Sequence, residues 1–135
     1  MKNITIFCAG LMIGTMAQAD NLEGVDEMLC AVGQVQICIE NDSCYSAHPA
    51  ELNVPNFVVI NTKEKTISTT KGSGLNRATP FNSVQREDGL IYLQGMESGR
   101  AFSFVIDESG GHMTVAVSRD GVAVNVFGVC TDTDL

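Results

Sequence analysis

The sequence contains no tryptophan, only two histidines and only three prolines. Basic residues are also scarce, because eight lysines and arginines stand against sixteen aspartates and glutamates, which gives a formal net charge of −8. Proteins that bind the phosphate backbone of nucleic acids need a concentrated basic surface. The composition therefore argues against a nucleic acid as a partner, and it leaves few side chains that could act as a catalytic base.

Beyond its first residues, the sequence also lacks any segment with the three-to-four-residue apolar spacing of a helix. It has no later apolar run near the roughly 20 residues that cross a bilayer as a helix. What it has instead is alternation of apolar and polar residues between short turn sequences. This pattern predicts an all-β domain with no transmembrane segment in the mature chain.

The N-terminus has the three parts of an export signal. Lys2 supplies a positive start, Ile4 to Met16 form a short apolar core, and Ala17-Gln18-Ala19 is a small-x-small cleavage site before Asp20. A buried N-terminal helix or strand is the alternative interpretation. We therefore predict a signal peptide over residues 1–19, a single β-rich domain over residues 20–135, and a periplasmic or extracellular location.

Cleavage at this site would remove Cys8 and leave Cys30, Cys38, Cys44 and Cys130. An even number of cysteines in an exported chain predicts two disulfides, and three pairings are open. We favour Cys38–Cys44, because a short turn-forming loop separates them, and Cys30–Cys130, which would tie the first strand to the last. The spacings differ from the close pairs of a zinc knuckle, so no metal site is predicted.

Two strands at opposite ends of the sequence have the strongest patterns. Residues 28–39 alternate with a period of two, which places Cys30 and Cys38 on the more polar face and makes Gly33 a candidate bulge. Residues 121–130 form an almost unbroken apolar run, typical of a central or doubly covered strand. In this run Cys130 falls on the same face as the valines expected to point inward, whereas Cys30 is expected to point outward. A bulge at Gly128 would remove this conflict.

The second half of the chain has a regular rhythm of turns. They fall about 10 to 12 residues apart, which is typical of an antiparallel meander. We predict about eight strands, including a hairpin over residues 56–70, arranged as a small closed or partly closed barrel, with a two-sheet β-sandwich as the alternative. Four phenylalanines are candidates to fill the interior, and an interior that holds one small ligand is the alternative. They are Phe57, Phe102, Phe104 and Phe127. The turn pairs are Asp88-Gly89, Ser98-Gly99, Gly110-Gly111 and Asp120-Gly121.

The candidate ligand-binding residues are Arg77 and Arg100. Arg77 follows the flexible-looking segment Lys71 to Asn76, and Arg100 follows Ser98-Gly99. Arginine suits two-pronged binding of carboxylate or phosphate, although ordinary pairing with surface acids is the alternative. No cofactor motif is present, because Gly72-Ser73-Gly74 lacks the lysine and the helix of a phosphate-binding loop.

No catalytic set is predicted. His48 and His112 both lie in turn sequences, and the cysteines that would be the nucleophiles are expected to be oxidised. The adjacent acids are expected to be solvated, without the burial that would raise a pKa for acid–base catalysis. These acids are Glu87, Asp88, Asp107 and Glu108.

Four stretches together resemble a group of small exported bacterial β-rich proteins of unknown function. They are Leu29 to Cys38, Leu52 to Asn61, Gly89 to Gly111 and Val126 to Cys130. The resemblance implies export and a β-rich domain, and it transfers no catalytic residue. A weaker, architectural likeness connects the chain to periplasmic lysozyme inhibitors, although Lys71-Gly72-Ser73-Gly74 only partly matches their serine-alanine-serine-glycine segment. The glycine-x-tryptophan signature of lipocalins is absent because the chain has no tryptophan.

These observations predict a non-enzymatic exported binding protein for a small ligand or an envelope protein partner. A periplasmic inhibitor or envelope-protection protein of the lysozyme-inhibitor type is the alternative function. Fold alone does not decide between them, since one architecture hosts many functions.

Overall fold

The structure is a computed structural model that describes residues 21–134, so the predicted export signal lies outside the described residues. Within these residues no helix is both long and apolar enough to cross a membrane. The ten strands are β1 (Glu27–Ile39), β2 (Tyr45–Ala47), β3 (Phe57–Asn61), β4 (Thr66–Thr69), β5 (Ala78–Pro80), β6 (Ser83–Glu87), β7 (Leu90–Glu97), β8 (Arg100–Asp107), β9 (His112–Arg119) and β10 (Val122–Asp132), and two short 3-10 helices are η1 (Pro49–Leu52) and η2 (Lys71–Ser73).

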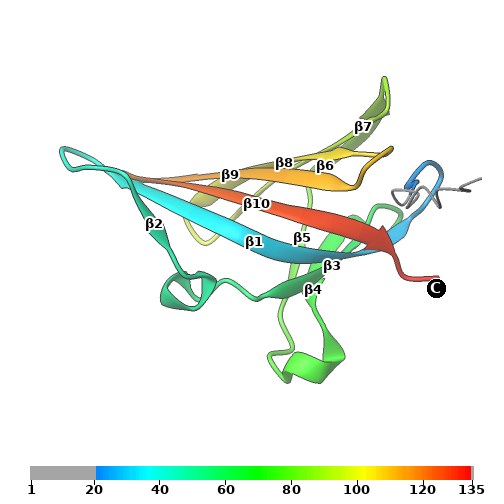
Figure 1. Cartoon of the computed structure of the whole chain (residues 1–135), viewed down its shortest axis with the longest axis horizontal. Coiled ribbons are helices and arrows are strands. Elements are labelled where there is room, and N and C mark those ends of the chain that lie inside the picture. Colours follow the sequence, from blue (N-terminus) through cyan, green and yellow to red (C-terminus); the bar gives the residue numbers. More distant parts are fainter. Residues whose placement is uncertain (1–20, 135) are drawn as a thin grey trace, which may run out of the picture.

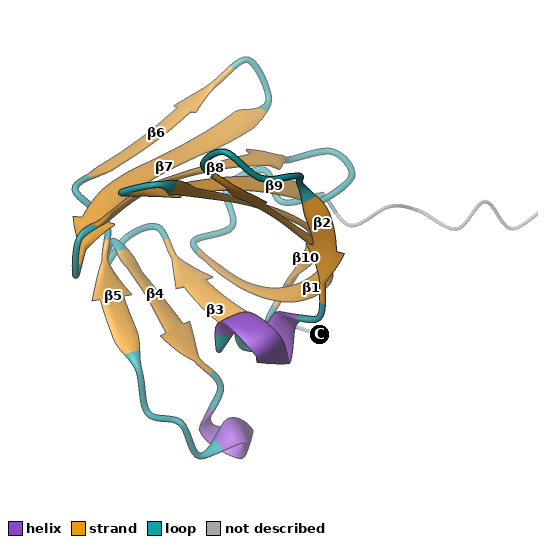
Figure 2. Cartoon of the chain, turned by 90° about the vertical axis from the view of Figure 1, so that its left-hand side faces the viewer, coloured by secondary structure: helices purple, strands orange, loops and turns teal. Residues whose placement is uncertain are grey.

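All ten strands belong to one antiparallel sheet, which confirms the all-β prediction. Nine strands follow the order β5-β4-β3-β1-β10-β9-β8-β7-β6, and β2 pairs with the second half of β1. The sheet curls into a half-barrel (Figures 1 and 2), with β1 and β10 side by side as expected for the first and last long strands. The count exceeds the predicted eight because β2 and β5, each of three residues, are too short to give a sequence signal.

The two edge strands of the sheet, β5 and β6, are consecutive in the chain. Only Phe81 and Asn82 separate them. The backbone N–H groups of these two residues donate to opposite ends of the strand order. Phe81 donates to the carbonyl of Lys65 at 2.8 Å, whereas Asn82 donates to the carbonyl of Gln94 at 2.8 Å. The two edge strands of the curled sheet are therefore joined at one corner by a two-residue link.

β1 changes its inward face at a bulge. The register with β10 shifts between Val32 and Gln34, so Gly33 adds one residue to the strand. Met28 and Cys30 point into the core before the bulge, and Val35 does so after it. The prediction that Cys30 lies on the polar face is therefore wrong, because a one-residue slip exchanges the faces.

Gly128 lies opposite this bulge without being its origin. It pairs with Val32, and a Cβ atom added to it would lie 2.3 Å from the carbonyl oxygen of Ala31. The bulge predicted at Gly33 is therefore confirmed and the bulge predicted at Gly128 is wrong, because Gly128 instead provides the space for the backbone of β1 to approach.

Two of the predicted turn pairs adopt the geometry in which both central residues have positive φ. Asp88 and Gly89 have φ of 52° and 78°, and the Ser98-Gly99 pair is alike. At the β9–β10 turn only Gly121 has positive φ, at 71°, so Asp120-Gly121 is a different turn type. The Gly121 carbonyl accepts a hydrogen bond from Glu40 at 2.9 Å, which ties this turn to the end of β1.

The phenylalanines divide between the two faces of the sheet. Phe102 and Phe104 point inward as predicted, together with Phe81 from the β5–β6 link, and their ring centroids lie 5.5–6.0 Å apart in edge-to-face contacts. Phe57 and Phe127 instead lie on the outer face, 51% and 43% exposed. These two candidates therefore do not fill the interior, and β10 is central but covered on one side only.

Both disulfides have the favoured pairing. Cys30 and Cys130 are direct partners across β1 and β10, with their Cα atoms 4.0 Å apart. Cys38 joins Cys44 just before β2. Two disulfides are compatible with a protein that leaves the reducing cytosol.

Candidate functional site

One end of the curled sheet is sealed by the segment that precedes β1. The side chain of Leu22 is fully buried, and its backbone N–H donates to the carbonyl of Glu108 at 2.7 Å. Thr62, in the β3–β4 turn, donates through its backbone N–H to the carbonyl of Asp26 at 2.8 Å. Residues 21–26 therefore act as a plug, which is the name used for them below.

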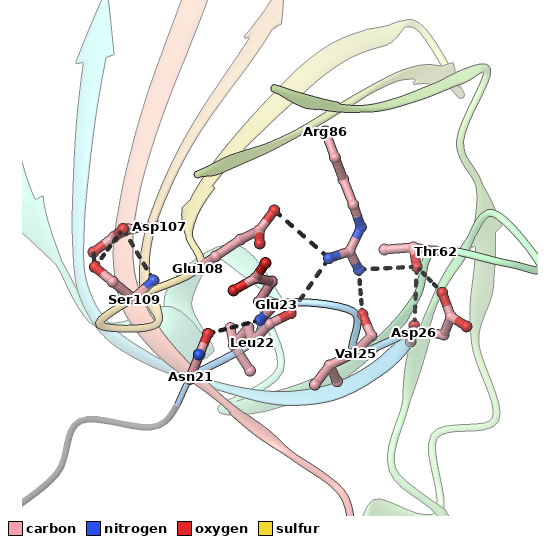
Figure 3. Close-up of polar contacts among 10 residues, drawn as sticks. All are labelled: Asn21, Leu22, Glu23, Val25, Asp26, Thr62, Arg86, Asp107, Glu108 and Ser109. Carbon is pink, nitrogen blue, oxygen red and sulfur yellow. Dashed lines mark hydrogen bonds and ion pairs between the residues drawn. The ribbon is translucent and has the colours of Figure 1, made fainter. Parts of the chain in front are cut away.

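Arg86 on β6 holds the plug in place. Its guanidinium donates hydrogen bonds to the carbonyl oxygens of Leu22, at 3.3 Å, and of Val25. It also forms an ion pair with Glu108 at 3.6 Å, and the side chains of Arg86 and Glu108 are 27% and 12% exposed. Figure 3 shows the guanidinium between Glu108 and the plug backbone, so that one side chain joins three separate segments.

The opposite end of the sheet is hollow. A cavity of about 220 Å³ opens between the β7–β8 hairpin, the ends of β3, β4 and β5, and the loop that follows η1. Its apolar lining comes from inward-facing strand residues and from this loop. The apolar side chains are Leu52, Val54, Pro55, Val58, Ile67, Phe102, Phe104 and Val117.

The loop that forms one wall has local reasons for its shape. Pro49 starts η1, where a missing N–H costs nothing, and Glu51 accepts a hydrogen bond from the backbone N–H of His48 at 3.3 Å. Asn53 ends it in the left-handed conformation with φ of 54°, which asparagine tolerates better than most residues. The chain then turns back over the cavity towards β3.

Both predicted arginines line this cavity, but their surroundings differ. Arg77 donates from both terminal nitrogens to the carbonyl oxygen of Asn53, each at 3.2 Å. Arg77 thereby links the β4–β5 connection to the loop after η1. Within residues 21–134 the side chain of Arg100 forms no hydrogen bond and no ion pair.

Glu97 and Thr79 complete the polar part of the lining. The hydroxyl of Thr79 donates to the carboxylate of Glu97, which connects β5 with β7. Glu97 also pairs with Arg100 across the Ser98-Gly99 turn, although the two charged groups form no ion pair in the described chain. The cavity is thus apolar inside and carries two guanidiniums and one carboxylate.

Sequence reasoning missed Glu97, Thr79 and the loop after η1. A usable signal exists for Glu97, since the residues that flank a two-residue hairpin turn face each other across it. Glu97 and Arg100 are such a pair. The loop and Thr79 carry no comparable signal, because only the curling of the sheet brings them to the cavity.

The other residues considered for catalysis lie away from the cavity. His48 precedes η1 and His112 begins β9, both exposed. Hydrogen bonds from the side chain and backbone N–H of Ser109, and then from the backbone N–H of Gly110, hold the pKa of Asp107 below its usual value. Within the described residues, no group of three histidine, cysteine, aspartate or glutamate side chains is placed to hold a metal ion.

The chain was also compared with known proteins, in sequence and in structure. It matches no protein-family model, no curated protein and no solved structure.

Proposed function

We propose that this chain is an exported, non-enzymatic binding protein that holds a small, largely apolar ligand in the open end of a partly closed barrel. One observation carries the proposal: a 220 Å³ apolar cavity lies at one end of the curled sheet while the plug seals the other. Barrel mouths are frequent sites for small molecules. The resemblance to small exported bacterial proteins agrees with the proposed location.

The size of the cavity limits the ligand. An engineered apolar cavity of about 150 Å³ binds benzene, so a cavity of 220 Å³ suits a molecule only slightly larger. Typical sites for drug-sized ligands begin at about 300 Å³. The ligand expected here is therefore a small metabolite or fragment rather than a haem, a nucleotide or a long lipid.

A binding role is also favoured over catalysis by the contents of the cavity. Its charged groups are Arg77, Glu97 and Arg100, and neither histidine lines it. The acid–base chemistry of an enzyme would need a group with a pKa near the working pH, close to a reacting atom. The cavity groups are better suited to orienting a bound molecule.

A thermal-shift screen of small apolar metabolites tests the proposal. A ligand at about 100 times its Kd should raise the free energy of unfolding by about 2.7 kcal/mol, or roughly 10 °C in Tm for a domain of this size. Val117→Phe should abolish the shift by filling the cavity, whereas Thr114→Phe, on the outer face of the same strand, should keep it. A shift that survives Val117→Phe would place the ligand elsewhere, and no shift with any compound would contradict the proposal.

Inhibition of a lysozyme is the second candidate function, through the loop Lys71 to Asn76. All six residues are exposed, and the β4–β5 connection that carries them extends away from the sheet (Figure 2). A projecting loop of this kind could enter the active-site cleft of an enzyme. Purified protein in excess over C-type lysozyme should then suppress its activity, and full lysozyme activity would remove this candidate.

A further inference from the structure

We infer that the ligand is a small monocarboxylate whose carboxylate is bound by Arg100 and whose apolar body occupies the cavity. The inference rests on the proposed function and specifies the class of ligand. Of the two arginines that the sequence indicated, Arg77 already donates hydrogen bonds within the protein, so Arg100 is assigned to the ligand.

The two arginines in the cavity lining differ in the hydrogen-bond donors that they leave available to a ligand. Arg77 directs both terminal nitrogens to the carbonyl oxygen of Asn53, so its role is to hold the wall of the cavity. Arg100 lines the same cavity, and within the described residues its guanidinium has no partner. A guanidinium offers a planar set of donors that matches the two oxygens of a carboxylate. Arg100 is therefore the group that a ligand can engage without displacing an existing contact.

The charges of the cavity lining favour a ligand with a single negative charge. Arg77 and Arg100 carry two positive charges, and Glu97 carries one negative charge, so the lining has a net charge of about +1 at neutral pH. A monoanion would neutralise this charge. A dianion such as a phosphate monoester would leave excess negative charge beside Glu97, on a chain whose formal net charge is already −8. A carboxylate therefore fits better than a phosphate.

The arrangement of apolar and charged side chains in the cavity limits the shape of the ligand. The apolar part of the lining includes Val58 and Phe104, which are buried, whereas Arg100 is exposed and lies beside the β7–β8 turn. This separation suits an amphipathic molecule with its anionic end at the turn and its apolar end inside. By comparison with benzene in a 150 Å³ cavity, the ligand would have roughly six to nine carbon atoms.

The test is isothermal titration calorimetry of the whole oxidised chain with four probes that each contain one unbranched chain of six carbon atoms. These are hexanoate, 1-hexanol, hexylamine and hexyl phosphate, at pH 7 and low salt. Hexanoate should bind about 10-fold to 100-fold more tightly than 1-hexanol, since a hydrogen-bonded charge pair contributes about 1.5–3 kcal/mol. Hexylamine should bind more weakly than 1-hexanol. Glu97→Gln should improve the affinity for hexyl phosphate more than the affinity for hexanoate.

Arg100→Leu should remove the preference for hexanoate and leave the affinity for 1-hexanol unchanged, which also shows that this variant is folded. Arg119→Leu removes the same charge near the same end of the sheet but outside the cavity lining, and it should behave as the wild type. If 1-hexanol binds and hexanoate binds no better, the inference is wrong and the proposed function stands. If none of the four probes binds, both the inference and the proposed function are wrong. Loss of 1-hexanol binding in Arg100→Leu would also overturn the inference, because Arg100 would then be structural.

Discussion

Replacing Cys30 and Cys130 together by alanine is expected to lower the free energy of unfolding by about 4–5 kcal/mol. The disulfide closes a loop with a sequence separation of 100 residues. In the chain-entropy model, a loop of about 100 residues contributes roughly 4.7 kcal/mol by restricting the unfolded chain. Both cysteines are also buried, at 0% and 2% exposure, so alanine would leave the core less well packed. Urea unfolding followed by circular dichroism measures the difference.

The second disulfide provides a matched control. Cys38 and Cys44 have a sequence separation of only six, for which the same model gives about 2 kcal/mol. Replacing this pair should therefore cost less than half as much. If the Cys30/Cys130 double variant lost no more stability than the Cys38/Cys44 double variant, the bridge between the first and last strands would not restrict the unfolded chain as described.

Replacing Arg86 by methionine is the second change with a large expected effect, a loss of about 2–4 kcal/mol. Methionine keeps the apolar stem but removes the hydrogen bonds to Leu22 and Val25 and leaves Glu108 as an unpaired, nearly buried acid. The plug should then open more often. Hydrogen exchange should show faster exchange of the amide of Leu22, whose hydrogen bond to Glu108 closes the end of the sheet.

Arg119→Met is the control for this change, since Arg119 is also an arginine near the end of a strand, before a turn, and is exposed. Substitution of such a surface residue should alter the free energy of unfolding by no more than about 0.5 kcal/mol. Equal stability and equal amide protection in the Arg86 and Arg119 variants would contradict the role assigned to Arg86.

Most of the fold follows from local patterns in the sequence. Alternation identified the long strands, and turn pairs such as Ser98-Gly99 marked their ends, because these signals depend on neighbouring residues. The pairing of Cys30 with Cys130 followed from placing the first and last strands together. The orientation of Cys30 did not, because one inserted residue at Gly33 reverses every face that precedes it.

The candidate site was less accessible to such reasoning. The sequence indicated Arg77 and Arg100 by their position beside loops, and the structure places both on one cavity. The sequence does not distinguish Arg77, which donates hydrogen bonds to Asn53, from Arg100, which does not. The plug was missed entirely, since the polar segment before β1 looks like an extended lead-in, and the burial of Leu22 depends on turns far away in the sequence.

The most direct test of the central claim is an amide NMR titration of the ¹⁵N-labelled chain with hexanoate. Binding in the cavity predicts shifts at Val58, Ile67 and Val117 and none at the plug or around the outward-facing Val129. Shifts centred on the outer face, or a spectrum unchanged by hexanoate and 1-hexanol alike, would contradict a ligand site in the open end of the sheet.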